Sequence, residues 1–163
     1  KKQKKHFSIE LGLQTSCQKS VEYINRRYQN EEYTDAVLRI KKINPDIHIV
    51  THIIFGLPGE TEEDMLNSVK FAVNAKTDGI KIQVLNVLKG TRLEDEYLKT
   101  KFHIMQSDEY FELVKKALKI IPPETVIHRL TGDGAKRLLI EPKWVSDKKF
   151  VLNNFLNKIL YSI

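Results

Sequence analysis

Four short segments of the sequence combine polar side chains with residues typical of turns, so they could bind a ligand. Each follows a run of residues that predicts a β-strand, and they comprise residues 12–16, 55–61, 85–91 and 128–133. In parallel α/β folds, ligands bind beyond the carboxyl ends of the strands, where the following loops and helix N-termini meet. The sequence therefore predicts that a ligand site is built from these loops.

The most informative of these loops has the sequence Gly-Leu-Pro-Gly-Glu-Thr at residues 56–61. Gly56 allows a ligand to approach the backbone closely, and Thr61 is expected to cap a helix, with Asp64 reaching back to it in a capping box. Such a corner is either a tight turn or an anion-binding helix terminus. The residue spacing does not decide between the two.

The strand at residues 7–13 carries one charged side chain. Glu10 should share a face with Gly12 and Gln14, because residues two apart in a strand point the same way. If that face is the interior, the carboxylate needs a partner, and Lys81 is the expected one.

Strand and helix patterns alternate along the chain, which indicates repeated βα units around a parallel sheet. The predicted strands comprise residues 7–13, 47–55, 80–88 and 125–130. Helices are predicted from residues 16 to 27, 31 to 43, 92 to 100 and 147 to 160, from Thr61 through the apolar stripe that ends at Val73, and from Ser107 to about Ile121.

Length and composition restrict the type of protein. The 163 residues suit one domain but not a complete eight-stranded barrel. The most apolar stretch, residues 47–57, is too short to cross a bilayer, and no export signal is evident, so no membrane contact is expected and the cytoplasm is the expected compartment.

The charge is concentrated at the start of the chain. Of the net charge of +6, four charges come from the lysines among the first five residues, which leaves +2 for the rest. This start is expected to be a solvated end rather than a nucleic-acid arm, although RNA binding stays open. The first residue is lysine rather than methionine, so we expect the chain to begin inside a longer protein.

Cysteine content limits the metal chemistry of the chain. Cys17 is the single cysteine, so the sequence can form neither an internal disulfide nor a thiolate metal site by itself. We expect Cys17 to be a packed or partly exposed thiol.

Four segments, in order, resemble radical S-adenosylmethionine (SAM) enzymes. Residues 51–61 resemble the motif of their fifth strand, and residues 9–15 resemble a fourth-strand segment of the coproporphyrinogen-dehydrogenase-like and Elongator-catalytic-subunit-like members. Residues 78–82 and 87–91 resemble the sixth strand and its following loop, and residues 122–134 are similar to bacterial Elongator-like radical SAM proteins. The resemblance extends from about residue 7 to residue 144.

The resemblance implies an α/β fold that is the C-terminal half of a partial TIM-like barrel, with about three to four βα units. The implied organisation is a basic end at residues 1–6, the half barrel at 7–144 and a C-terminal helix packed on it at 145–163. A half barrel leaves its first strand as an open edge, so we expect the chain to self-associate or to cover that edge with its own terminal segment.

The implied activity of the full-length protein is that of an Fe–S oxidoreductase that cleaves SAM reductively to a 5′-deoxyadenosyl radical. In the family, three cysteines in the first βα loop bind a [4Fe–4S] cluster. This sequence lacks that set, so the fragment is expected to be inactive, to lack the cluster, and to contain no catalytic or metal-binding residue.

Two polar residues match family positions near the SAM ribose. Gln14 matches a glutamine expected to bond the ribose; the alternative is that it caps the strand end. His52 stands where related enzymes often have aspartate, and the alternative is a core histidine bonded to backbone.

Other positions match packing and substrate contacts. The resemblance implies that Ile54 forms an apolar wall near the adenine and that Gly56 allows its close approach. Leu85 and Asn86 match the end of the strand that contacts this base. Glu10, Lys81 and a second polar cluster are candidates for the substrate side, the cluster consisting of His128, Arg129 and Asp133. The alternative for this cluster is a structural Arg–Asp pair.

Two other functions stay open at this point. One is a non-enzymatic RNA-binding module, and the other is a (β/α) enzyme that binds phosphate at residues 56–61. The sequence does not indicate the substrate.

Overall fold

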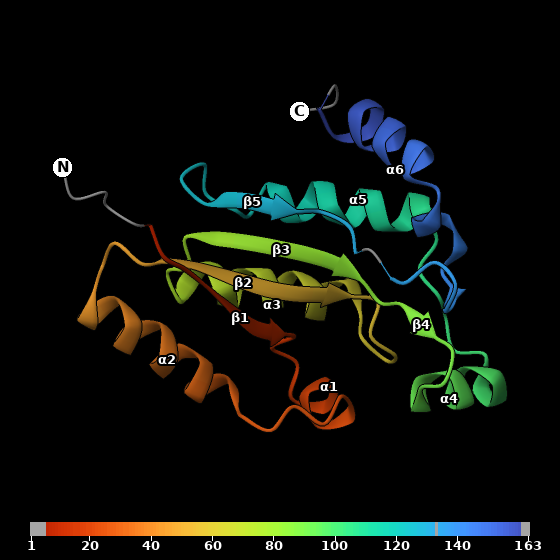
Figure 1. Cartoon of the computed structure of the whole chain (residues 1–163), viewed down its shortest axis with the longest axis horizontal. Helices are drawn as coiled ribbons and strands as arrows, with labels where there is room; N and C mark the ends of the chain where they lie inside the picture. Colours follow the sequence, from red (N-terminus) through yellow and green to blue (C-terminus); the bar gives the residue numbers. More distant parts are fainter. Residues whose placement is uncertain (1–5, 133, 161–163) are drawn as a thin grey trace.

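The structure is a computed structural model that describes residues 6–132 and 134–160 (Figure 1). Its centre is a parallel sheet of four strands in the order β1-β2-β3-β5. These strands are β1 (Ser8–Gln14), β2 (His48–Phe55), β3 (Gly79–Val84) and β5 (Val126–Arg129). The fold class is that expected from the sequence, an α/β half barrel.

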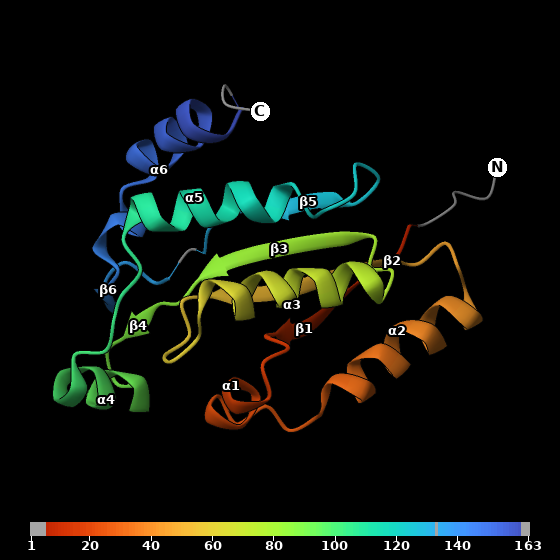
Figure 2. The ribbon, with the colours of Figure 1, turned by 180° about the vertical axis from the view of Figure 1, so that it is seen from behind.

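The connecting helices lie on one face of the sheet, as Figure 2 shows from the helical side, and the opposite face is seen in Figure 1. The helices that follow β1, β2 and β4 are α1 (Gln18–Tyr23), α2 (Asn30–Ile43), α3 (Glu62–Asn74), α4 (Arg92–Thr100) and α5 (Ser107–Leu118). Among the described helices, none is long and apolar enough to cross a membrane.

Alternation along the strands separates the two faces of the sheet. Ile53, Ile80 and Ile82 are fully buried toward the helices and pack in the same core as Phe111. Burying one such side chain stabilises a fold by about 1.5–3 kcal/mol. His52 and Lys81 alternate with these isoleucines along the strands and lie on the other face.

The third predicted strand is shorter than expected and is followed by a separate strand. Residues 80–88 divide into β3 and the two-residue β4 (Val87–Leu88), because the last bond to the main sheet runs from the Leu85 amide to the Phe55 carbonyl at 2.8 Å. Strand β4 pairs antiparallel with β6 (Leu139–Glu141), which the sequence pattern did not predict.

The C-terminal segment packs beside α5. A short helical turn, Lys143–Ser146, leads into α6 (Lys148–Phe155) and a wider turn, Leu156–Leu160. Lys158 joins this segment to Asp108 of α5 at 2.6 Å.

A side-chain cap explains where α3 begins, whereas α1 has no such cap. The predicted capping box of α3 is confirmed, since Thr61 and Asp64 exchange bonds. The helix predicted from residue 16 begins at Gln18 instead. Ser16 does not cap it, because its amide donates to Ser68 Oγ at 2.8 Å and its hydroxyl lies 3.2 Å from the same atom.

Candidate functional site

The carboxyl ends of β2 and β3 bring three predicted site residues together. Gly56 has a positive φ of 87°, and a Cβ built there would lie 3.5 Å from Cβ of Met105 and 4.0 Å from Cβ of Leu85. Asn86 follows Leu85 directly. Gly56, Leu85 and Asn86 therefore form one corner at the rim of the sheet.

Asn86 has an unsatisfied polar atom at this corner. Its Oδ1 is buried and has no hydrogen-bond partner among the described residues. A loop passes close to its amide nitrogen, since Cβ atoms built on Gly132 and Gly134 would lie 3.4 and 3.2 Å from Nδ2. Buried acceptors are rarely left unpaired, so Oδ1 suits a hydrogen bond from a bound ligand.

Gln14 ends β1 in a left-handed conformation, with φ of 57°. In the amide orientation that satisfies its neighbours, its nitrogen donates to the carbonyls of Gly12 at 2.6 Å and Leu13 at 3.1 Å. The side chain therefore contacts its own strand end in this orientation, and its oxygen remains an acceptor for other groups.

Arg26 holds the backbone on both sides of Gln14. Its guanidinium donates to the carbonyls of Leu13 and, at 2.9 Å, of Thr15, and to Asn30 Oδ1 at 2.6 Å. It also lies 4.9 Å from the centre of the Tyr28 ring, and burial lowers its pKa from the usual value. No periodic pattern in the sequence marks this arginine as partly buried.

A second set of contacts joins the loops after β1 and β2. The Thr15 hydroxyl donates to Glu60 Oε1 at 2.5 Å and lies 3.3 Å from Ser68 Oγ. Burial raises the pKa of Glu60. Glu60 is part of the loop that the sequence singled out, but nothing in the sequence showed that it reaches Thr15.

A charged network lies across the middle of the open face. Glu10 accepts from Lys81 Nζ at 2.5 Å and contacts His52 Nε2 at 2.6 Å, while Gln83 Nε2 lies 3.3 Å from His52 Nδ1. The predicted pairing of Glu10 with Lys81 is thus present, although Glu10 is half exposed rather than buried. The hydrogen bond from Lys81, and then that from His52, lowers the pKa of Glu10.

His128 lies away from the rim, near the amino ends of the strands. Its Nε2 is 2.9 Å from Nε2 of His48, and a Cβ on Gly79 would lie 2.6 Å from its ring, so a side chain at residue 79 would displace that ring. Burial lowers the pKa of His128, and the nearby His48 adds to this effect. The next residue, Arg129, pairs in register with Lys81, whereas Asp133 lies outside the described residues.

The described residues do not provide an iron–sulfur site. No three His, Cys, Asp or Glu side chains among them are arranged to hold a metal ion, and Cys17 is a half-buried free thiol. One thiolate does not match a cluster that needs three. The residues that the structure describes therefore do not by themselves fit a [4Fe–4S] cluster.

The helix terminus after β2 is poorly suited to phosphate. Its first turn contains Glu62, Glu63 and Asp64, and the Asp64 carboxylate already accepts from the Thr61 amide at 2.9 Å. The amide and the charge that would attract an anion are therefore already used.

Comparison with known proteins gives two family matches. Residues 2–72 match the radical SAM superfamily, and residues 77–160 match the radical SAM C-terminal domain.

The chain is also similar to individual proteins. The uncharacterized protein YtqA of Bacillus subtilis is 40% identical over 144 residues, which are 88% of this chain and 44% of YtqA. The tRNA-2-methylthio-N(6)-dimethylallyladenosine synthase of Thermosipho melanesiensis is 37% identical over 52% of this chain and 20% of its own length. The chain thus spans less than half of these relatives.

A solved structure shares the fold. The archaeal Elp3 of Methanocaldococcus infernus, with an N-terminal deletion, superposes with a TM-score of 0.77 over 93% of this chain and 36% of that structure, at 20% identity.

Proposed function

The chain belongs to the radical SAM superfamily, and from this we propose that its sheet forms the adenosine side of a SAM site in a longer enzyme. The observation that carries the proposal is the unsatisfied Asn86 oxygen at the corner that also contains Gly56 and Leu85. An adenine amino group is a donor that would satisfy it.

The residues at the rim would bind and orient SAM. Asn86 and the backbone beside Leu85 would contact the adenine edge, and Gly56 and Ile54 would pack against its face. Gln14, held by Arg26, would present its amide oxygen to the ribose hydroxyls. In the longer enzyme, SAM held by these residues beside a reduced cluster would supply the radical chemistry of the family.

The middle of the open face would form the floor beneath this site. Glu10, His52 and Lys81 satisfy one another, so in this proposal His52 orients the network rather than bonding the ribose directly. Lys81 and Arg129 leave this floor with more positive than negative charge, which would favour an anionic substrate group.

We further propose that these 163 residues alone do not cleave SAM, because they contain one cysteine and do not fit the cluster. The complete open reading frame, reconstituted anaerobically with iron and sulfide, is expected to form 5′-deoxyadenosine from SAM and a reductant, and the 163-residue chain is not. A cluster-loaded complete protein that never cleaves SAM would refute the proposed chemistry.

Binding of S-adenosylhomocysteine tests the site without the cluster. Titration of the chain by calorimetry should show binding that Asn86→Leu weakens about tenfold, because the hydrogen bond to a buried acceptor is lost. Asn67→Leu is the matched control, since Asn67 is exposed on α3. Equal affinities for the two variants would argue against the role of Asn86.

RNA is a second candidate ligand. One relative is named as a tRNA-modifying synthase, and this chain has a net charge of +6. Filter binding of unmodified tRNA at increasing salt should show a steep loss of affinity if phosphates are contacted. Salt-independent or undetectable binding would remove this candidate.

The outer edge of β1 is a candidate surface for self-association. No strand among the described residues pairs with it, so we propose that this edge accepts another strand, from a second copy or from the rest of a longer protein. Light scattering should find dimers of the 163-residue chain and monomers of the complete protein; monomers of both would contradict dimerisation.

A further inference from the structure

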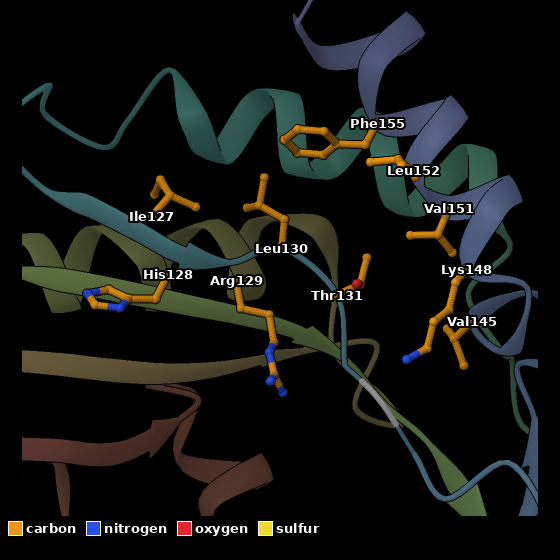
Figure 3. A pocket seen from close by; sticks show the side chains of 10 residues that line it. All are labelled: Ile127, His128, Arg129, Leu130, Thr131, Val145, Lys148, Val151, Leu152 and Phe155. Atoms are coloured by element: carbon orange, nitrogen blue, oxygen red, sulfur yellow. The ribbon is translucent and has the colours of Figure 1, made fainter.

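A pocket of about 390 Å³ lies between β5 and α6 (Figure 3). One wall is the end of β5 and the loop after it, and the other is the C-terminal helix. The pocket has the size of a small-molecule site.

The walls of the pocket are mainly apolar. Leu130 lies on the β5 side, and Val151, Leu152 and Phe155 of α6 lie opposite. Leu152 is 57% exposed although it lines the pocket, so a ligand there would cover apolar surface that now faces water. Covering such surface provides affinity for an apolar group.

The charged residues of the lining are all basic. Arg129 and Lys148 extend toward the same end of the pocket in Figure 3, and no Asp or Glu is among the described lining residues. Among the described residues, no hydrogen bond or ion pair to the Arg129 guanidinium is found. Arginine is suited to bind a carboxylate through two parallel hydrogen bonds.

The pocket continues toward the proposed SAM corner. Thr131 lines it, and the next residue, Gly132, passes within contact distance of the Asn86 side chain. A ligand in the pocket would therefore lie next to the rim.

From this geometry we propose that the pocket binds a carboxylate with an apolar body, its head group on Arg129 and its tail between Leu130 and α6. If the proposed function holds, this is the class of the substrate; the binding itself does not require SAM. The anionic substrate group that the positive charge of the open sheet face would favour is, in this proposal, a carboxylate.

Three ligands with the same tail test the proposal: octanoate, 1-octanol and octylammonium. Binding to the 163-residue chain can be followed by the fluorescence of Trp144, the single tryptophan, which precedes Val145 of the lining. Octanoate should bind about fivefold more tightly than octanol, and octylammonium should bind most weakly. Acetate should not bind detectably, because it lacks the tail.

Two substitutions separate the head-group contact from the tail contact. Arg129→Leu should abolish the preference for octanoate over octanol while octanol still binds, and Leu152→Asp should weaken both. Arg39→Leu is the matched control, because this arginine has a side chain 75% exposed on α2. It should leave both affinities unchanged.

Several results would overturn the proposal. These are equal binding of octanoate and octanol to the unmodified chain, no binding of either, an unchanged preference in Arg129→Leu, or a dimer through this face that excludes octanoate. Binding of S-adenosylhomocysteine to Leu152→Asp should persist, because Leu152 lines the pocket and is not part of the proposed SAM site, so a failure of the pocket is distinguishable from a failure of the SAM site.

Discussion

Replacing Arg26 by methionine should destabilise the chain and loosen the end of β1. Methionine retains the aliphatic bulk of the side chain but removes every donor of the guanidinium. The carbonyls of Leu13 and Thr15 would lose their guanidinium donor. The Tyr28 carbonyl, which lies 2.9 Å from Nε, and the Asn30 side chain would lose theirs as well.

The magnitude follows from the number of groups left without a donor. An unsatisfied, partly buried carbonyl costs about 1–3 kcal/mol, and Arg26 bonds three carbonyls, some of which water can reach after the substitution. Burial of the guanidinium charge costs free energy, which is why the pKa of Arg26 is lowered. Methionine carries no charge, so this cost disappears in the variant and offsets part of the loss. We therefore expect a net loss of about 2–4 kcal/mol in the free energy of unfolding.

Urea unfolding followed by circular dichroism measures this loss. Arg39→Met is the control and should change stability by less than about 0.5 kcal/mol, because its side chain is exposed and its ion pair with Asp35 spans 3.5 Å. Arg26→Lys should be intermediate, since one ammonium group cannot reach all of the acceptors. A loss below about 0.5 kcal/mol for Arg26→Met would refute the assigned role.

Three further predictions concern single contacts. Burial raises the pKa of Glu60, so as pH rises the folded protein keeps the carboxyl proton longer than the unfolded chain does. The stability of the fold should therefore fall as pH rises above the ordinary value of 4.5. Melting temperatures measured across pH should show this decline for the unmodified chain and not for Glu60→Gln. Lys81→Met should raise the pKa of Glu10, measured by carboxyl-carbon NMR, and an unchanged value would show that Lys81 does not hold that carboxylate in solution. Tyr110→Phe should cost about 1 kcal/mol in urea unfolding, because the fully buried hydroxyl donates to Leu130 O at 2.7 Å; a neutral effect would contradict the value of that bond.

The strands were predictable because their helix-facing residues form a dense apolar pattern. Ile49, Ile53 and Phe55 alternate through β2, and each is fully buried in the structure. The short β6 was not predictable, because Leu139–Glu141 forms a strand only through pairing with β4, a contact that local sequence does not encode.

The polar site was predictable in outline and not in detail. Alternation placed Glu10 on the inner face and indicated Lys81 as its partner, since both positions follow from the strand period. The contacts of Arg26 and Glu60 depend on how loops that are distant in sequence pack together, and no local pattern records this. His128 was grouped with Arg129 because they are adjacent in sequence, but the irregular pairing of β5 directs its ring to His48 instead.

The parts of the rim differ in how firmly they are held. Leu85 is fixed by a backbone bond to the Phe55 carbonyl within the sheet, so its position follows from strand pairing. Gln14 lies beyond a register shift in β1, in a left-handed conformation that the ladder does not impose, and its position depends on loop contacts from Arg26 and Thr15. Substitutions in those loops should therefore weaken the ribose contact while the adenine corner is retained, which makes Arg26 a positioning residue for Gln14 and not for Asn86.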